Sequence, residues 1–127
     1  MNLLATIMLY AGSVVITVWG IAHIVPTKSV IAGFEPLTED NRRILIMEWV
    51  SAGLTLCFIG VLAFSVTVIG PRDSVGSLFA LRGSAVMLLI MAFWTLVTGG
   101  RTSTVQFKIC PMVKTAVAAL FLVGSAL

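Results

Sequence analysis

The stretch that decides the fold is ILIMEWVSAGLTLCFIGVLAFSVTVI, residues 44–69, in which Glu48 is the only charged side chain. At about 1.5 Å per residue, a helix of this length covers the roughly 30 Å of hydrocarbon in a bilayer. Inside lipid every backbone N–H and C=O must be satisfied, and a helix does this within one segment. Polar and apolar residues do not alternate here as they would in a membrane strand. The stretch therefore predicts a membrane-spanning α-helix.

Three more apolar stretches of similar length lie at residues 3–25, 78–97 and 109–127. Of the 127 residues, 59% are hydrophobic and 10% charged, and the mean hydropathy is +1.12. A soluble domain carries about a quarter charged residues, so composition excludes that class. We predict an all-α, polytopic membrane protein: a single domain over residues 1–127 with four transmembrane helices in an antiparallel bundle, and a lipid bilayer as its surroundings.

The basic residues predict an orientation. With four spans, the connections 26–43 and 98–108 share one side, and both ends of the chain share the other with the 70–77 turn. The side of the two connections has six basic residues, Lys28, Arg42, Arg43, Arg101, Lys108 and Lys114, and the other has two, Arg72 and Arg82. The positive-inside rule then places the connections in the cytoplasm and both ends outside. No basic run is dense enough to indicate nucleic-acid binding.

The first connection contains the signals for a helix start. Pro36 interrupts any helix before it, and Thr38 is a good N-cap residue. Glu39 and Asp40 follow, where a carboxylate interacts favourably with the positive end of the helix dipole. We expect the second helix to begin a turn or more before its apolar part at Ile44.

Three ionisable residues within or beside the apolar stretches need an explanation, because charge is costly in lipid: His23, Glu48 and Arg82. Trp19 and His23 share a helix face at i, i+4 spacing. Since consecutive helices pack about 8–10 Å apart, we expect His23 and Glu48 to approach within about 8 Å at one membrane face. Arg42 or Arg43 could neutralise a partly buried Glu48 instead of His23.

These residues allow a functional interpretation. Trp19, His23, Glu48 and Trp49, with Arg43, would line a polar pocket at the cytoplasmic mouth of the bundle. A His–carboxylate pair could move a proton or hold a polar ligand head. In the competing interpretation the same residues simply lie among hydrated headgroups. No metal site is predicted, because one His, one Glu and a distant Cys do not form a recognised ligand spacing.

Arg82 and the small residues remain. Arg82 either extends to the headgroups, pairs with Asp73, or meets an acidic residue of a partner chain. Small side chains let helices approach closely, either inside the bundle or between chains. They form three faces: Ser13, Thr17 and Gly20; Ser51, Ala52 and Thr55; and Gly76, Ala80 and Ser84.

No catalytic motif occurs. A glycine-rich phosphate loop, HExxH, GxSxG and paired cysteines are all missing, and Cys57 and Cys110 lie far apart. No cofactor is indicated, and we do not expect an enzyme. The sequence favours a structural or accessory subunit that assembles with itself or with a larger membrane complex. The alternative is a small-ligand binding or transport protein that uses the His23–Glu48 pocket.

Four segments carry a resemblance: residues 19–27 (WGIAHIVPT), 40–43 (DNRR), 47–49 (MEW) and 107–111 (FKICP). In these the chain resembles a group of small, uncharacterised prokaryotic four-span integral membrane proteins. The resemblance implies the four-helix fold and a prokaryotic plasma membrane. It implies no activity and no catalytic residue.

Overall fold

The computed structural model describes residues 2–127, which form four long helices and two short ones. The long helices are α1 (Leu3–Ile24), α3 (Glu39–Ile69), α4 (Val75–Val97) and α5 (Gln106–Ala126), and the short ones are α2 (Thr27–Ala32) and the 3-10 turn η1 (Gly99–Arg101). Four regions, with η1 continuing α4, are long and apolar enough to cross a membrane. The predicted all-α fold is confirmed, and the chain is a small integral membrane protein.

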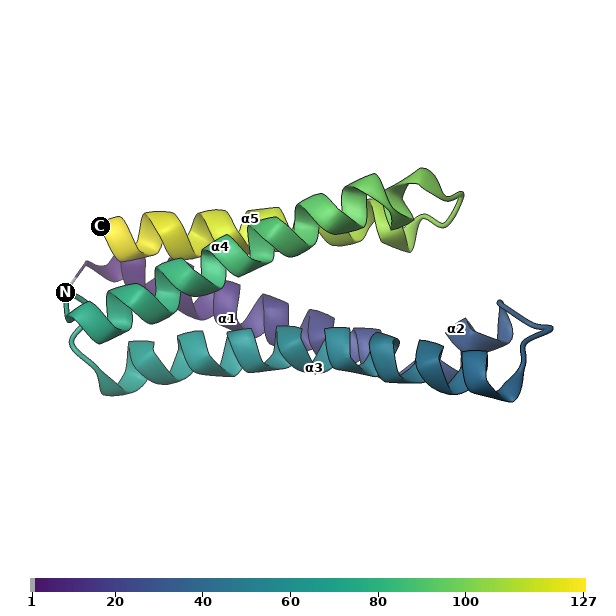
Figure 1. Ribbon diagram of the computed structural model, residues 1–127. Coiled ribbons are helices and arrows are strands. Elements are labelled where there is room, and N and C mark those ends of the chain that lie inside the picture. The colour runs from purple at the N-terminus through teal and green to yellow at the C-terminus, as the bar shows by residue number, and fades with distance from the viewer. Residues whose placement is uncertain (1) are drawn as a thin grey trace.

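The long helices form two antiparallel pairs (Figure 1). Helix α1 packs on α3 and α4 packs on α5, while α1 also packs on α5 and so joins the pairs. Contact between α3 and α4 is sparser. Both ends of the chain lie beside the α3–α4 turn, and α2 and η1 lie at the opposite end.

Side-chain caps explain where three helices begin. The side chains of Asn2, Thr38 and Ser74 each accept a hydrogen bond from a backbone N–H in the first turn of α1, α3 and α4, at 3.0, 3.2 and 3.2 Å. These bonds satisfy donors that have no partner within the helix. The expected cap at Thr38 is confirmed, and α3 begins at Glu39, ahead of the apolar part at Ile44.

Two details differ from the sequence expectation. Helix α5 begins at Gln106 rather than at residue 109, and it contains Pro111. The first connection, expected to be without helix before Pro36, contains the short helix α2. Helix α1 ends just before Pro26, and the hydroxyl of Thr27 then donates a hydrogen bond to the carbonyl of Ile24.

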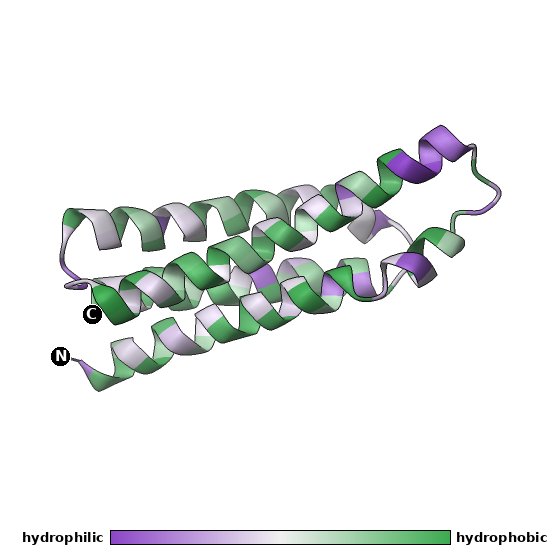
Figure 2. Cartoon of the chain, turned by 90° about the horizontal axis from the view of Figure 1, so that it is seen from below, coloured by the Kyte–Doolittle hydropathy of each residue, from purple (hydrophilic) through white to green (hydrophobic). Residues whose placement is uncertain are grey.

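The interior of the bundle consists of apolar side chains from all four long helices. The largest fully buried ones are Leu9, Ile16, Leu56, Leu81, Leu88, Val117 and Phe121. Many outward side chains are also apolar, as lipid contact requires. In Figure 2 the most hydrophilic colouring lies near the first turns of α3, at the end of the molecule that holds α2.

Candidate functional site

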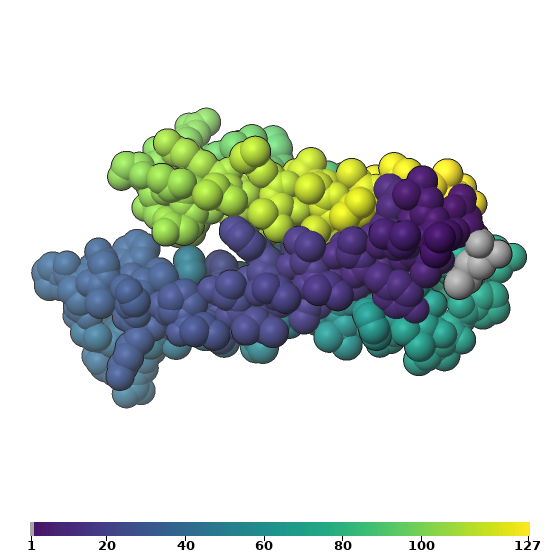
Figure 3. All heavy atoms as spheres, turned by 180° about the vertical axis from the view of Figure 1, so that it is seen from behind, coloured from purple at the N-terminus to yellow at the C-terminus, as the bar shows by residue number. Residues whose placement is uncertain are grey.

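A pocket of about 660 Å³ lies between the two helix pairs, at the end that holds α2 and η1. The space-filling view shows the hollow there, between the first turns of α5 and the end of α1 (Figure 3). Its lining comes from α1, α2, α3, α5 and the connections, so no single element forms it. The lining residues are Trp19, Ala22, His23, Pro26, Ser29, Val30, Gly33, Phe34, Trp49, Thr104, Gln106, Phe107 and Cys110.

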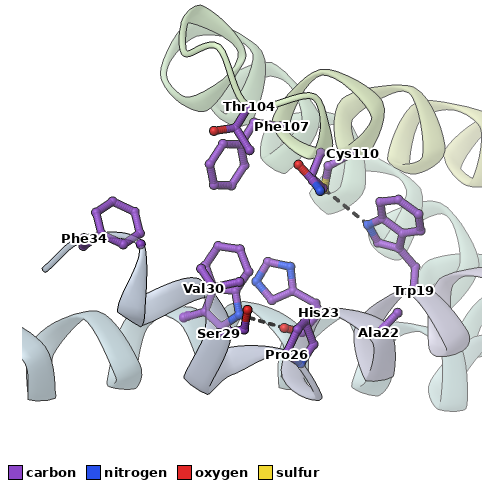
Figure 4. A pocket seen from close by; sticks show the side chains of 13 residues that line it. Trp19, Ala22, His23, Pro26, Ser29, Val30, Phe34, Thr104, Phe107 and Cys110 are labelled. Carbon is purple, nitrogen blue, oxygen red and sulfur yellow. Dashed lines mark hydrogen bonds between the residues drawn. The ribbon is translucent and has the colours of Figure 1, made fainter.

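His23 is the central polar side chain of the pocket. Its imidazole stacks on the Trp49 indole, with ring centroids 4.0 Å apart and planes inclined by 15°. Figure 4 shows the ring extending from α1 toward the wall formed by Phe107 and Cys110. Its Nε2 atom is buried and has no hydrogen-bond partner among residues 2–127. A buried polar atom without a partner is costly, and this one belongs to a side chain that lines a cavity.

Aromatic contacts hold the two walls in place. The Nε1–H of Trp49 donates a hydrogen bond of 2.7 Å to the carbonyl of His23, and the Trp49 ring meets Phe107 edge-on at 5.9 Å. The Nε1–H of Trp19 donates to the Sγ atom of Cys110 at 3.3 Å (Figure 4). Two indoles from the α1–α3 pair therefore contact α5 on either side of the pocket.

The polar part of the lining is neutral. Ser29, Thr104 and Gln106 contribute hydroxyl and amide groups, and no Lys, Arg, Asp or Glu side chain of the described chain lines the pocket. Most of the remaining lining is aromatic or aliphatic. This combination, a mainly apolar surface with a few polar groups, is typical of sites for small organic molecules.

A buried lysine lies on α5, one helical turn after the lining residue Cys110. Lys114 is 5% exposed, and its Nζ donates a hydrogen bond of 3.1 Å to the Oγ1 atom of Thr95 on α4. Within residues 2–127 no carboxylate lies within ion-pair distance of this ammonium group. Sequence reasoning counted Lys114 only as a topological charge. Its position five residues inside the stretch 109–127 was the signal that could have identified it.

Three of the five residues predicted from the sequence to form a site come together here. Trp19, His23 and Trp49 line the pocket, whereas Glu48 and Arg43 do not. Both of these side chains are exposed, and Arg43 pairs with Glu39 at 3.0 Å.

The expected ion pair of Glu48 is wrong. Among the described residues Glu48 has no salt-bridge partner, and Arg42 binds Glu35 and Glu39 instead. The physical reason is the helix period, since neighbouring residues point about 100° apart. Trp49 takes the face toward α1 and stacks on His23, which turns Glu48 outward.

Arg82 and the small-residue faces also have definite places. The guanidinium of Arg82 reaches Ser125 on α5, at 3.4 Å to the hydroxyl and 3.5 Å to the carbonyl. The pair with Asp73, one of the three alternatives, does not form in the described chain. Ser13 and Gly20 are buried inside the bundle, as is Ser84. Gly76 is exposed.

Comparison of the chain with known protein families, curated proteins and solved structures gives no match. The resemblance noted in the sequence is thus supported at the level of architecture alone, as a small chain with four candidate spans. In residues 2–127, no three His, Cys, Asp or Glu side chains gather as a metal ion would require.

Proposed function

We propose that this single four-helix domain binds a small amphipathic molecule in the pocket between its helix pairs. The observation that carries the proposal is the buried Nε2 atom of His23, which has no protein partner at the wall of an aromatic cavity. A ligand that hydrogen-bonds this atom would remove the cost of burying it alone.

The chemistry of the lining supports an organic ligand with a flat, apolar body. Trp19, Phe34, Trp49 and Phe107 offer ring faces and edges, and a volume of about 660 Å³ suits a molecule of drug size. The pocket lies at the end of the bundle that holds α2 and η1. One end of a bound molecule can meet water there, and its other end can meet lipid. Glu48 and Arg43 are not part of the proposed site.

Tryptophan fluorescence of the purified protein in lipid nanodiscs tests this proposal. Trp19 and Trp49 line the pocket, whereas Trp94 is 66% exposed on α4, so a Trp94→Phe background makes the emission report on the pocket. We expect 4-nitrocinnamamide, a non-emitting aromatic quencher, to quench this emission saturably. His23→Phe keeps a ring against Trp49 but removes Nε2, and should weaken binding by about five- to tenfold or more.

Glu48→Gln is the matched control, because Glu48 lies outside the pocket and should leave the affinity unchanged. Quenching that is not saturable, or equal affinities for the parent and His23→Phe, would contradict a binding pocket at His23.

Assembly with a second chain is the other candidate function, and one observation favours it. A Cβ atom added at Gly76 or Gly83 of α4 would meet nothing within 4 Å, whereas one at Gly12, Gly20, Gly53, Gly60 or Gly124 would meet another helix. The partner would be a second copy of this chain or a larger membrane complex. We expect Gly83→Leu to lower the proportion of chemically cross-linked oligomer in membranes, and an unchanged proportion would count against this face.

We also propose the orientation that the basic residues indicate, in a prokaryotic plasma membrane, with residues 26–43 and 98–108 in the cytoplasm. Cysteines introduced at Ser103 and at Asp73 test it in a Cys57→Ala, Cys110→Ala background. A membrane-impermeant maleimide should label position 73 in intact cells, and position 103 only in inverted vesicles. The reverse pattern would overturn the orientation without affecting the pocket.

A further inference from the structure

Resting on the proposed ligand pocket, we infer that the pocket selects an amphipathic organic anion, with Lys114 as the buried counter-charge for its head. The inference joins two features one helical turn apart on α5. One is a neutral aromatic pocket, and the other is a buried ammonium group without a carboxylate at ion-pair distance among residues 2–127.

The lysine is the first element of the argument. An ionisable group inside a membrane bundle is costly, and such groups pair with an opposite charge or take part in function. The ammonium of Lys114 donates a hydrogen bond to the neutral Thr95 hydroxyl, which in turn donates to the carbonyl of Met91. The structure thus holds the cation in place without balancing its charge.

The position of Lys114 links it to the pocket. Phe107, Cys110 and Lys114 follow one another at i, i+3 and i+7 along α5 and therefore share a helix face. Phe107 and Cys110 line the pocket, and the backbone of Lys114 lies one helical turn, or roughly 6 Å, along α5 from that of Cys110. In a medium of low dielectric a charge acts strongly over such a distance.

No acidic side chain competes for the role of counter-ion. Glu35 and Glu39 pair with Arg42 and Arg43 near the start of α3. Asp40 and Glu48 are exposed on the same helix, Asp73 is exposed in the turn between α3 and α4, and none of the three lines the pocket. The negative charge that would balance Lys114 must therefore come from outside the chain, and the pocket is the space beside it.

The chemical class of the ligand follows. Its head is a carboxylate or phosphate placed near Nε2 of His23, and its body is apolar enough to lie against Trp19, Trp49 and Phe107. A free organic acid and an anionic phospholipid both have this chemistry. Cationic amphiphiles and metal ions are disfavoured, because the buried charge on α5 is positive.

Three quenchers with similar bodies and different heads test the inference in the Trp94→Phe protein. We expect 4-nitrocinnamate to bind about tenfold more tightly than the neutral 4-nitrocinnamamide, and 4-nitrophenethylammonium to bind most weakly. Lys114→Met should bring the anion-to-amide affinity ratio close to one and leave the amide affinity unchanged. Lys108→Met is the control, because Lys108 is exposed and should alter the ratio little.

Replacing an unpaired buried charge with an apolar side chain of similar length should leave the protein folded. If Lys114→Met does not fold, Lys114→Gln removes the charge while keeping a donor for Thr95. Nanodiscs of phosphatidylcholine and of phosphatidylglycerol distinguish the two sources of the anion. The neutral nitrocinnamamide is the probe here, because an anionic bilayer does not repel it. Weaker amide binding in phosphatidylglycerol identifies the lipid as a competitor for the pocket, and equal amide binding favours a free organic acid.

Failure of this inference differs from failure of the proposed function. Equal affinities for the anion and the amide, both lost in His23→Phe, would overturn anion selection and leave the pocket as proposed. A preference for the anion that persists in Lys114→Met and Lys114→Gln would also overturn the role of Lys114. Absence of saturable quenching by all three probes would overturn the pocket itself.

Discussion

Trp49 shows how one side chain joins several parts of this protein. Its ring stacks on His23 and meets Phe107 edge-on, while its N–H donates to the carbonyl of His23. That carbonyl belongs to the last turn of α1, where backbone acceptors have no partner within the helix. The indole therefore satisfies a backbone acceptor at the end of α1, orients the imidazole, and forms one wall of the pocket.

We predict that Trp49→Phe destabilises the protein by about 0.5–1.5 kcal/mol, the usual net worth of one hydrogen bond. The phenyl ring retains the stacking surface for His23 but cannot donate to its carbonyl. The free energy of unfolding in a mixed-micelle SDS titration measures the change. Trp94→Phe is the control, because Trp94 is 66% exposed and should change the free energy by less than about 0.5 kcal/mol.

The pairing of α1 with α3 depends on close backbone approach. A Cβ atom at Gly60 would collide with the Thr17 hydroxyl and lie 2.8 Å from the carbonyl of Ser13, and one at Gly20 would lie 2.8 Å from the carbonyl of Gly53. In lipid no hydrophobic force drives helices together, so such close packing supplies much of the association. The α1 face of Ser13, Thr17 and Gly20 is therefore used within the bundle, against Gly53 and Gly60 of α3, whereas Ser51 of the expected α3 face is exposed.

We predict that Gly60→Ala destabilises the protein by about 1–3 kcal/mol, because the methyl group forces α1 and α3 apart. Gly83→Ala is the matched substitution on α4, where an added Cβ atom meets nothing within 4 Å. It should be neutral, or stabilising by up to about 1 kcal/mol through helix propensity. The same SDS titration compares them, and equal losses in the two variants would contradict the close α1–α3 contact.

The molecule as a whole consists of two helical hairpins that pack together mainly through one pair of helices. Helices α1 and α3 form the first hairpin and α4 and α5 the second, and the α1–α5 contact holds them together. At that contact a Cβ atom at Gly12 would lie 2.8 Å from the Phe121 ring, and one at Gly124 would lie 2.9 Å from Leu9. The pocket occupies the space between the hairpins at the opposite end from the chain termini.

We predict that the chain can be divided at its α3–α4 turn. Co-expressed segments 1–71 and 72–127 should copurify from membranes, because each contains a complete hairpin and the α1–α5 contact is noncovalent. Gly124→Leu should abolish copurification by blocking the approach of α1, whereas Gly76→Leu should not, since Gly76 has open space beside it. Copurification that survives Gly124→Leu would contradict this joining contact.

Much of the candidate site was within reach of sequence reasoning. Trp19 and His23 were placed on one helix face by their spacing, and Trp49 was expected at the same level. Phe34, Phe107 and Cys110 were not predicted as lining residues, because they come from a connection and from α5. No local sequence pattern predicts where two helical hairpins separate from each other. Lys114 was overlooked although its position inside an apolar stretch made it visible.

Composition and the length of the apolar stretches were sufficient to establish four membrane-spanning helices, because lipid leaves the backbone few other options. Thr38, followed by the acidic residues Glu39 and Asp40, likewise determined the start of α3, because an N-cap is a local interaction. The partner of His23 depended on helix rotation and axial offset, which arise from packing between distant residues. Trp49 rather than Glu48 meets His23 for this reason, and the same packing buries Lys114 without a carboxylate at ion-pair distance in the described part of the chain.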